Sequence, residues 1–125
     1  MPPTRVILYQ EADGRVPLDD WLGALPAKAR AKCQVRLDRL EELGHKLRRP
    51  EAAYLREGIY ELRMTHSGVN YRMLYFFDRT EAMVVSHGFS KQQGPVPPRE
   101  IMLALRRKAA FAADPAAHTF TPEAD

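Results

Sequence analysis

Two arginines, Arg63 and Arg72, have the types and spacing that most directly suggest chemistry. They fall in two neighbouring predicted strands, residues 59–65 and 69–77. Alternating side chains point to opposite sides of a strand, so if the larger apolar sets face the core, both arginines emerge on the same open face. Two guanidinium groups there can grip a phosphate. The simpler alternatives are that either arginine pairs with Glu61 or lies over the aromatic rings of the sheet.

A third predicted strand, residues 82–89, adds groups that can move protons. His87 has the intrinsic pKa closest to neutrality, which suits proton transfer. The alternative is a histidine at a strand end whose ring packs beside Val85 and Phe89. Lys91 follows directly, and a lysine near other positive charges can act as a base or an acid.

Other polar residues near these strands have simpler interpretations. Glu61 is a further candidate for proton transfer, whereas His66 is expected to be an ordinary turn residue. The lone cysteine, Cys33, is predicted to be a buried structural thiol. No pair of histidines, cysteines or carboxylates has convincing ligand spacing, so neither a metal nor another cofactor is predicted.

The elements that must position these groups can be placed from proline, glycine and periodicity. A strand is predicted over 5–10 and a brief helix, capped by Asp19 or Asp20, through Leu25. Helix 27–43 has apolar residues on one face and stops at Gly44. A last helix starts at Pro98 and runs to about residue 113. Helices with an antiparallel sheet indicate an α+β fold.

The far side of helix 27–43 is basic. A solvated helix face is the simpler interpretation, and contact with phosphates is the alternative. The residues of this side are Lys28, Arg30, Lys32, Arg36 and Arg39.

The whole chain has 125 residues, a formal charge of +3 and a pI near 9.2. This length predicts a single domain over 1–113, followed by a loosely held tail over 114–125 that is dispensable for folding. The charge suggests an acidic partner, either nucleic acid or protein. No apolar stretch suits a membrane span or a signal peptide, so a cytoplasmic protein without membrane contact is expected.

Residues 55–109 resemble the HigB-like branch of the RelE/ParE superfamily of type II toxins, whose members include phage-derived-protein-like toxins. The resemblance rests on LREGIYELR, YRMLYFF, HGFSKQ and PPREIMLALRR in this order, and PLDDWLGALPAKARAKCQVRLDRLEELG is similar to the family's helical hairpin. It implies a RelE-like fold: the hairpin packed on one side of a curved, mainly antiparallel sheet, a C-terminal helix, and a basic concave surface on the other side.

The resemblance also implies a function. Active members are metal-independent endoribonucleases that cleave mRNA, commonly on the ribosome, and so inhibit translation. A protein antitoxin, often with a helix-turn-helix domain, neutralises them. We therefore expect Arg63, Arg72 and Lys91 to bind RNA and, with His87, to form the catalytic set. The sequence departs from the branch pattern at Gln92, which follows Lys91 where two lysines are common.

Two other functions share this fold. Relatives of the ParE type act on gyrase and cleave no RNA, and a degenerate member would be an interaction protein without toxicity. Fold alone does not separate these alternatives.

Overall fold

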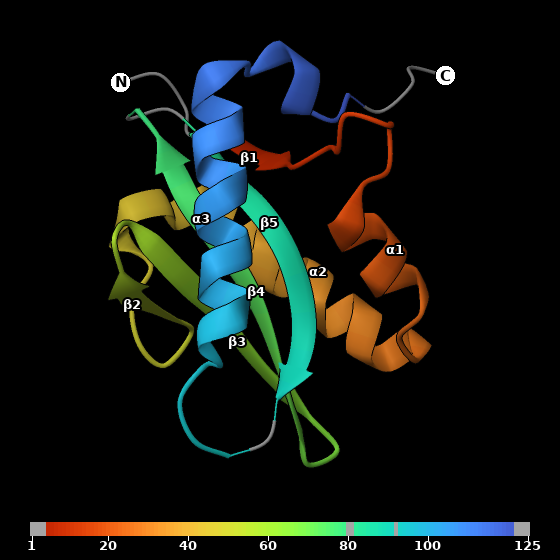
Figure 1. Ribbon diagram of the computed structural model, residues 1–125. Coiled ribbons are helices and arrows are strands. Elements are labelled where there is room, and N and C mark those ends of the chain that lie inside the picture. Colours follow the sequence, from red (N-terminus) through yellow and green to blue (C-terminus); the bar gives the residue numbers. More distant parts are fainter. Residues whose placement is uncertain (1–4, 80–81, 92, 122–125) are drawn as a thin grey trace.

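The computed structural model describes residues 5–79, 82–91 and 93–121. They form a twisted five-stranded sheet with helices packed against it (Figure 1). The strands lie in the order β1-β5-β4-β3-β2, with β1 parallel to β5 and the other pairs antiparallel. Their bounds are β1 (Arg5–Leu8), β2 (Ala52–Arg56), β3 (Ile59–His66), β4 (Val69–Asp78) and β5 (Ala82–Lys91). The α+β class and the antiparallel strands β3 to β5 are confirmed, while β2 was not predicted.

Three helices cover the sheet from both sides (Figure 1). Helices α1 (Pro17–Gly23) and α2 (Ala27–Leu43) lie on one side, and α3 (Pro98–Ala113) crosses the other. Short 3₁₀ turns, η1 (Gly44–Lys46) and η2 (Ala116–His118), follow α2 and α3. The predicted cap of α1 was wrong, because Pro17 occupies the first turn, where its missing N–H costs nothing.

The first core lies between the sheet and the helical pair. Alternation correctly predicted which strand residues face these helices, although Val69 at the start of β4 is exposed. Cys33 is buried as expected, and burial raises the pKa of its thiol to about 11. The members include Leu18, Leu22, Cys33, Leu37 and Leu40 of the helices and Leu62, Met64, Tyr71, Met73 and Tyr75 of the strands.

The second core corrects the expectation that the side of the sheet opposite the helical hairpin is an open basic surface. Leu74 and Phe76, which alternation places on the opposite face, are fully buried beneath α3. The physical reason is that α3 has its own apolar stripe, which includes Ile101 and Phe111 and must be removed from water. The face that carries Arg63 and Arg72 is therefore partly covered by α3, and the two arginines lie beside the loop that precedes this helix.

The described part of the predicted tail makes specific contacts. The ring of His118 stacks on Tyr9, with centroids 4.9 Å apart, and its Nδ1 lies 2.8 Å from the Gln10 carbonyl oxygen. The Phe120 N–H donates to the Leu8 carbonyl. Residues 118–120 thus lie beside the end of β1 and the two residues that follow it, while the end of the tail lies outside the described residues. In the part of the chain that the structure describes, no helix is long and apolar enough to cross a membrane.

Candidate functional site

The four predicted site residues share the α3 side of the sheet. Arg63 on β3 is directly opposite Arg72 on β4, and Arg72 is opposite Phe89 on β5. One row away on either side, His87 is opposite Leu74 and Lys91 is opposite Asn70. The register of β5 shifts at Ser86, and this shift brings His87 to the same side as the arginines.

Arg72 is buried, which corrects the expectation of an exposed arginine. It is only 4% exposed, and its Nε lies 2.7 Å from Glu61 Oε1, although the N–H is not aligned for a hydrogen bond. Its Nη1 donates to the Tyr71 carbonyl at 3.0 Å. Burial lowers the pKa of Arg72 from its ordinary value, and the Glu61 carboxylate opposes this shift. The alternative that an arginine pairs with Glu61 is confirmed.

Arg63 is the more accessible member of the pair. Its side chain is 32% exposed, and its Nε lies 3.8 Å from the same Glu61 oxygen. Two like charges directly opposite each other repel, and the carboxylate between them offsets this repulsion. One carboxylate cannot neutralise two guanidinium groups, so the pair keeps an excess positive charge.

Two hollows in the surface meet at these arginines. The smaller, which we call the β5 hollow, has a volume of about 230 Å³ and brings Lys91 together with Arg63 and Arg72. The larger, the α2–β3 hollow, has a volume of about 600 Å³ and extends from the same arginines toward α2. The β5 hollow is lined by Arg49, Glu61, Arg63, Arg72, Lys91, Gly94, Pro95 and Val96.

Lys91 ends β5 at the mouth of the β5 hollow. It is half-buried, and its ammonium group donates to the Gly94 carbonyl, which ties it to the loop before α3. Gln92, the departure from the branch pattern, lies outside the described residues.

His87 is separated from the other three residues. It is 7% exposed and lines neither hollow. Its Nδ1 lies 2.8 Å from Ser86 Oγ and its Nε2 lies 3.1 Å from Glu100 Oε1 at the start of α3. Burial lowers the pKa of His87, against the hydrogen bond to Glu100, and the charge of Arg107 acts in the same direction as burial. These contacts join β5 to α3, and a catalytic role for His87 stays a prediction.

The sequence interpretation missed Arg49 and Glu51, which belong to the loop before β2. The chain folds this loop back against β3, where the Arg63 N–H donates to the Glu51 carbonyl at 2.7 Å. The only signal was a run of charged residues beside Pro50, and such runs are common in solvated loops. Arg36 and Arg39, expected on a solvated helix face, are half-buried and paired with Glu51.

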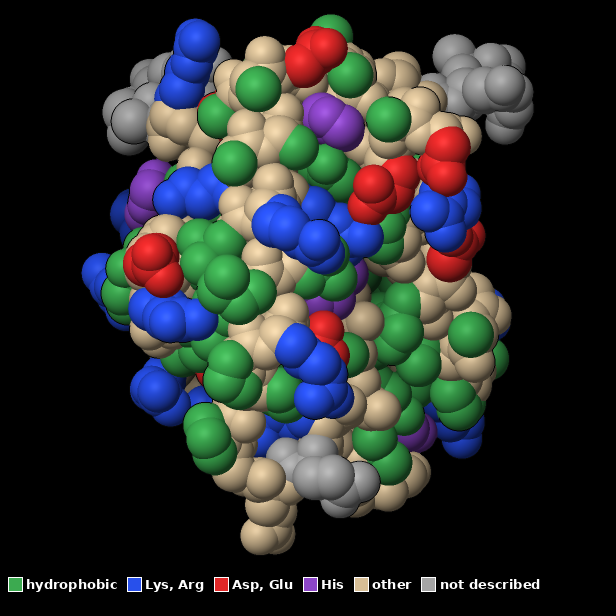
Figure 2. Space-filling view, viewed as in Figure 1, with side chains coloured by type: hydrophobic (Ala, Val, Ile, Leu, Met, Phe, Trp, Pro, Cys, Tyr) green, Lys and Arg blue, Asp and Glu red, His purple; other side chains and the backbone are tan. Residues whose placement is uncertain are grey.

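The α3 side of the molecule is basic around this site. Figure 2 shows Lys and Arg side chains distributed over the face that α3 covers, with hydrophobic side chains between them. Within the described ranges, no group of three or more histidines, cysteines or carboxylates is placed to hold a metal ion.

Residues 20–109 match the family model described as phage-derived protein Gp49-like (DUF891). The matched range runs from α1 into α3 and contains both hollows. No curated protein matches the chain.

Proposed function

Because the chain belongs to the Gp49-like family of phage-derived proteins, which is a family of RelE/HigB-like toxins, we propose that it cleaves RNA as the toxin of a toxin–antitoxin pair. The observation that carries this proposal is the β5 hollow, where Arg63, Arg72 and Lys91 converge. With Arg49, the hollow has four cations beside one carboxylate, which suits a phosphodiester, whose charge grows during cleavage.

Cleavage without a metal requires three events. The 2′-hydroxyl loses a proton and attacks phosphorus, the pentacoordinate phosphate gains charge, and the departing 5′-oxygen takes up a proton. The products are a 2′,3′-cyclic phosphate and a 5′-hydroxyl. Arg63 and Arg72 stabilise the phosphate charge, because guanidinium groups stay protonated and present paired donors.

Proton transfer falls to the other polar residues of the β5 hollow. Among the described lining residues, only Glu61 and Lys91 carry a side chain that exchanges protons. We assign Glu61 as the acceptor for the 2′-hydroxyl proton and Lys91 as the donor to the 5′-oxygen. In this proposal His87 is a positioning residue in place of the predicted catalytic one, since it holds Glu100 at the start of α3 and thereby the loop that lines the hollow.

The partners follow from this proposal. mRNA, with or without the ribosome, is the substrate, and a protein antitoxin is the partner that silences the toxin. A helix-turn-helix domain in that antitoxin would let the pair bind its own operon. The hydrophobic side chains Val35, Tyr54 and Met102 are more than half exposed and are available for such contacts.

One observation favours a second function. The burial of Arg72 against Glu61 is also what a purely structural ion pair would show, as expected for a toxin of the ParE type or an inactive interaction protein. Induced expression in a bacterium, with and without the neighbouring open reading frame, separates the three functions. Growth arrest with new mRNA ends supports the nuclease, arrest without them indicates another target, and normal growth indicates an inactive protein.

A further inference from the structure

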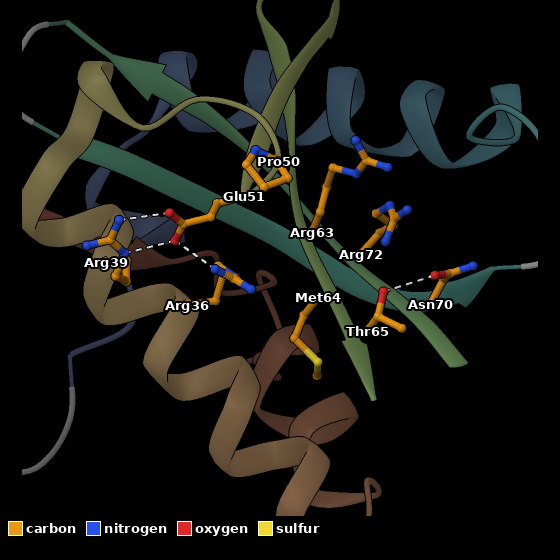
Figure 3. Close-up of a pocket in the computed structure, with 9 residues that line it drawn as sticks. All are labelled: Arg36, Arg39, Pro50, Glu51, Arg63, Met64, Thr65, Asn70 and Arg72. Carbon is orange, nitrogen blue, oxygen red and sulfur yellow. Dashed lines mark hydrogen bonds and ion pairs between the residues drawn. The ribbon is translucent and has the colours of Figure 1, made fainter. Parts of the chain in front are cut away.

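The α2–β3 hollow contains a second pair of arginines that the proposed cleavage chemistry does not use. Arg36 and Arg39 extend from α2 to Glu51, and Arg63 and Arg72 line the same hollow from β3 and β4 (Figure 3). Glu51 holds both of them: its Oε2 accepts from Arg36 Nη1 at 2.6 Å and Arg39 Nε at 2.8 Å, and its Oε1 accepts from Arg39 Nη2 at 2.7 Å.

The charge of this hollow is unbalanced. Its lining holds four arginines and one glutamate, together with Pro50, Met64, Thr65 and Asn70. A guanidinium group has five N–H donors, and Glu51 takes one from Arg36 and two from Arg39. The Arg36 Nε–H is buried without a hydrogen-bond partner in the described part of the chain. That N–H is closed to solvent, so the donors that remain for an anion are the Nη groups of Arg36 and Arg39 that Glu51 does not use.

The backbone leaves room for an extended ligand. The register between β2 and β3 ends at Leu62, so Met64 to His66 form a free edge of β3 within the described chain. The hollow lies along this edge and is continuous with Arg63 and Arg72, which line both hollows. A volume of about 600 Å³ is more than one inorganic anion fills and is in the range of sites for larger ligands.

We propose that the α2–β3 hollow binds a second phosphate of the same RNA strand whose scissile phosphate lies at Arg63 and Arg72. Arg36 and Arg39 contact this phosphate, which competes with the Glu51 carboxylate for their N–H donors. The inference rests on the proposed function. It makes RNA the ligand because the hollow continues from the cleavage site, and neighbouring phosphates of one strand would reach both arginine pairs.

The test is binding of a 2′-O-methyl RNA of about eight nucleotides, which lacks the attacking hydroxyl and spans the site size common for single strands. We expect Arg36→Gln with Arg39→Gln to weaken binding about tenfold in low salt and to reduce the slope of log Kd against log salt by about 0.7 per lost phosphate contact. Arg30→Gln, an exposed arginine on the same helix outside the hollow, is the matched control and should bind like the wild type.

Glu51→Gln should change RNA affinity in the direction opposite to the Arg36/Arg39 double variant. Removing the carboxylate frees both guanidinium groups for phosphate, so RNA binding should tighten severalfold even though the ion pairs are lost. Glu51→Gln still tests the inference if the Arg36/Arg39 double variant fails to fold, a failure that circular dichroism would detect. The inference is overturned if the folded double variant binds like Arg30→Gln, or if Glu51→Gln binds no tighter than the wild type.

Failure of the inference differs from failure of the proposed function. If Arg63→Ala weakens binding and the Arg36/Arg39 variant does not, only the second phosphate site is lost. If the wild-type chain binds no RNA at all, both proposals fall.

Discussion

Glu61 and Arg72 form a buried ion pair, with Arg72 Nε 2.7 Å from Glu61 Oε1 and side chains that are 10% and 5% exposed. A buried pair contributes little net stability, but removing one partner leaves the other charge without compensation. The stability of the sheet therefore depends on Arg72, in addition to the role of Arg72 as a phosphate ligand in the proposed function.

Arg72→Ala should therefore destabilise the protein by about 3 kcal/mol, because Glu61 is left buried with only the longer ion pair to Arg63, at 3.8 Å. Adding Glu61→Gln removes that charge and should restore part of the loss without restoring RNA cleavage. Urea unfolding of the two variants measures the difference. An Arg72→Ala free energy of unfolding within about 0.5 kcal/mol of the wild type would mean that the pair is not buried in solution.

The lowered pKa of His87 predicts how the stability of the folded protein depends on pH. Its pKa is lowered in the folded protein by burial, whereas the unfolded chain takes up the proton near pH 6.5. The unfolded state therefore binds more protons as pH falls below about 6.5, and the contribution present above that pH is progressively lost.

Urea unfolding between pH 8 and pH 5 should accordingly show a smaller decline for His87→Gln than for the wild type. His66→Gln is the control for losing one imidazole; His66, which the sequence predicted to be a turn residue, is the last residue of β3 and is paired with Val69. An identical pH dependence in His87→Gln and the wild type would exclude His87 as the origin of the decline.

The ring of Trp21 packs against Gly88 and leaves no room for a side chain there. A Cβ built on Gly88 would lie 2.2 Å from Trp21 Cε3, so the α1 side chain packs directly on the backbone of β5. Gly88→Ala should cost about 1–3 kcal/mol through overpacking. Adding Trp21→Leu should make the two changes less than additive, and additive free energies would contradict the contact.

Truncation after Ala113 tests the tail. The sequence predicts that it is dispensable, whereas the contacts of His118 and Phe120 with Tyr9, Gln10 and Leu8 predict that it stabilises β1. We expect a melting temperature lower by about 5 °C, the effect of roughly 1 kcal/mol in a domain of this size. His118→Ala in the full chain should reproduce part of the shift. An unchanged melting temperature would support a dispensable tail.

The pairing of Arg63 with Arg72 was predictable because alternation and a short turn fix register locally. The burial of Arg72 was not, since Arg72 lies beside the loops at Arg49 and at Gly94 to Val96, which are distant from it in sequence. Alternation assigns a face to each residue, but it does not say what covers that face.

The missed strand β2 has a similar explanation. Its sequence, AAYLR, has neither clean alternation nor β-branched residues, and its pairing with β3 is interrupted by a register shift at Tyr54 and Arg56. The side of the sheet on which His87 lies, relative to Val85, depends on the register shift at Ser86. No local sequence pattern predicts this shift.

The most direct measurement is the chemistry of new RNA ends after expression of the wild type and of Arg63→Ala. Arg63 is 32% exposed and its nearest carboxylate oxygen is 3.8 Å away, so the substitution should cost no more than about 1 kcal/mol of stability. Loss of one transition-state donor should reduce cleavage by about 10²–10³-fold. Arg30→Ala is the control for an exposed arginine elsewhere. We predict abundant 5′-hydroxyl ends with the wild type and with Arg30→Ala, and near-background levels with folded Arg63→Ala. Equal levels in all three, or ends that carry a 5′-phosphate, would contradict arginine-assisted, metal-independent cleavage at this site.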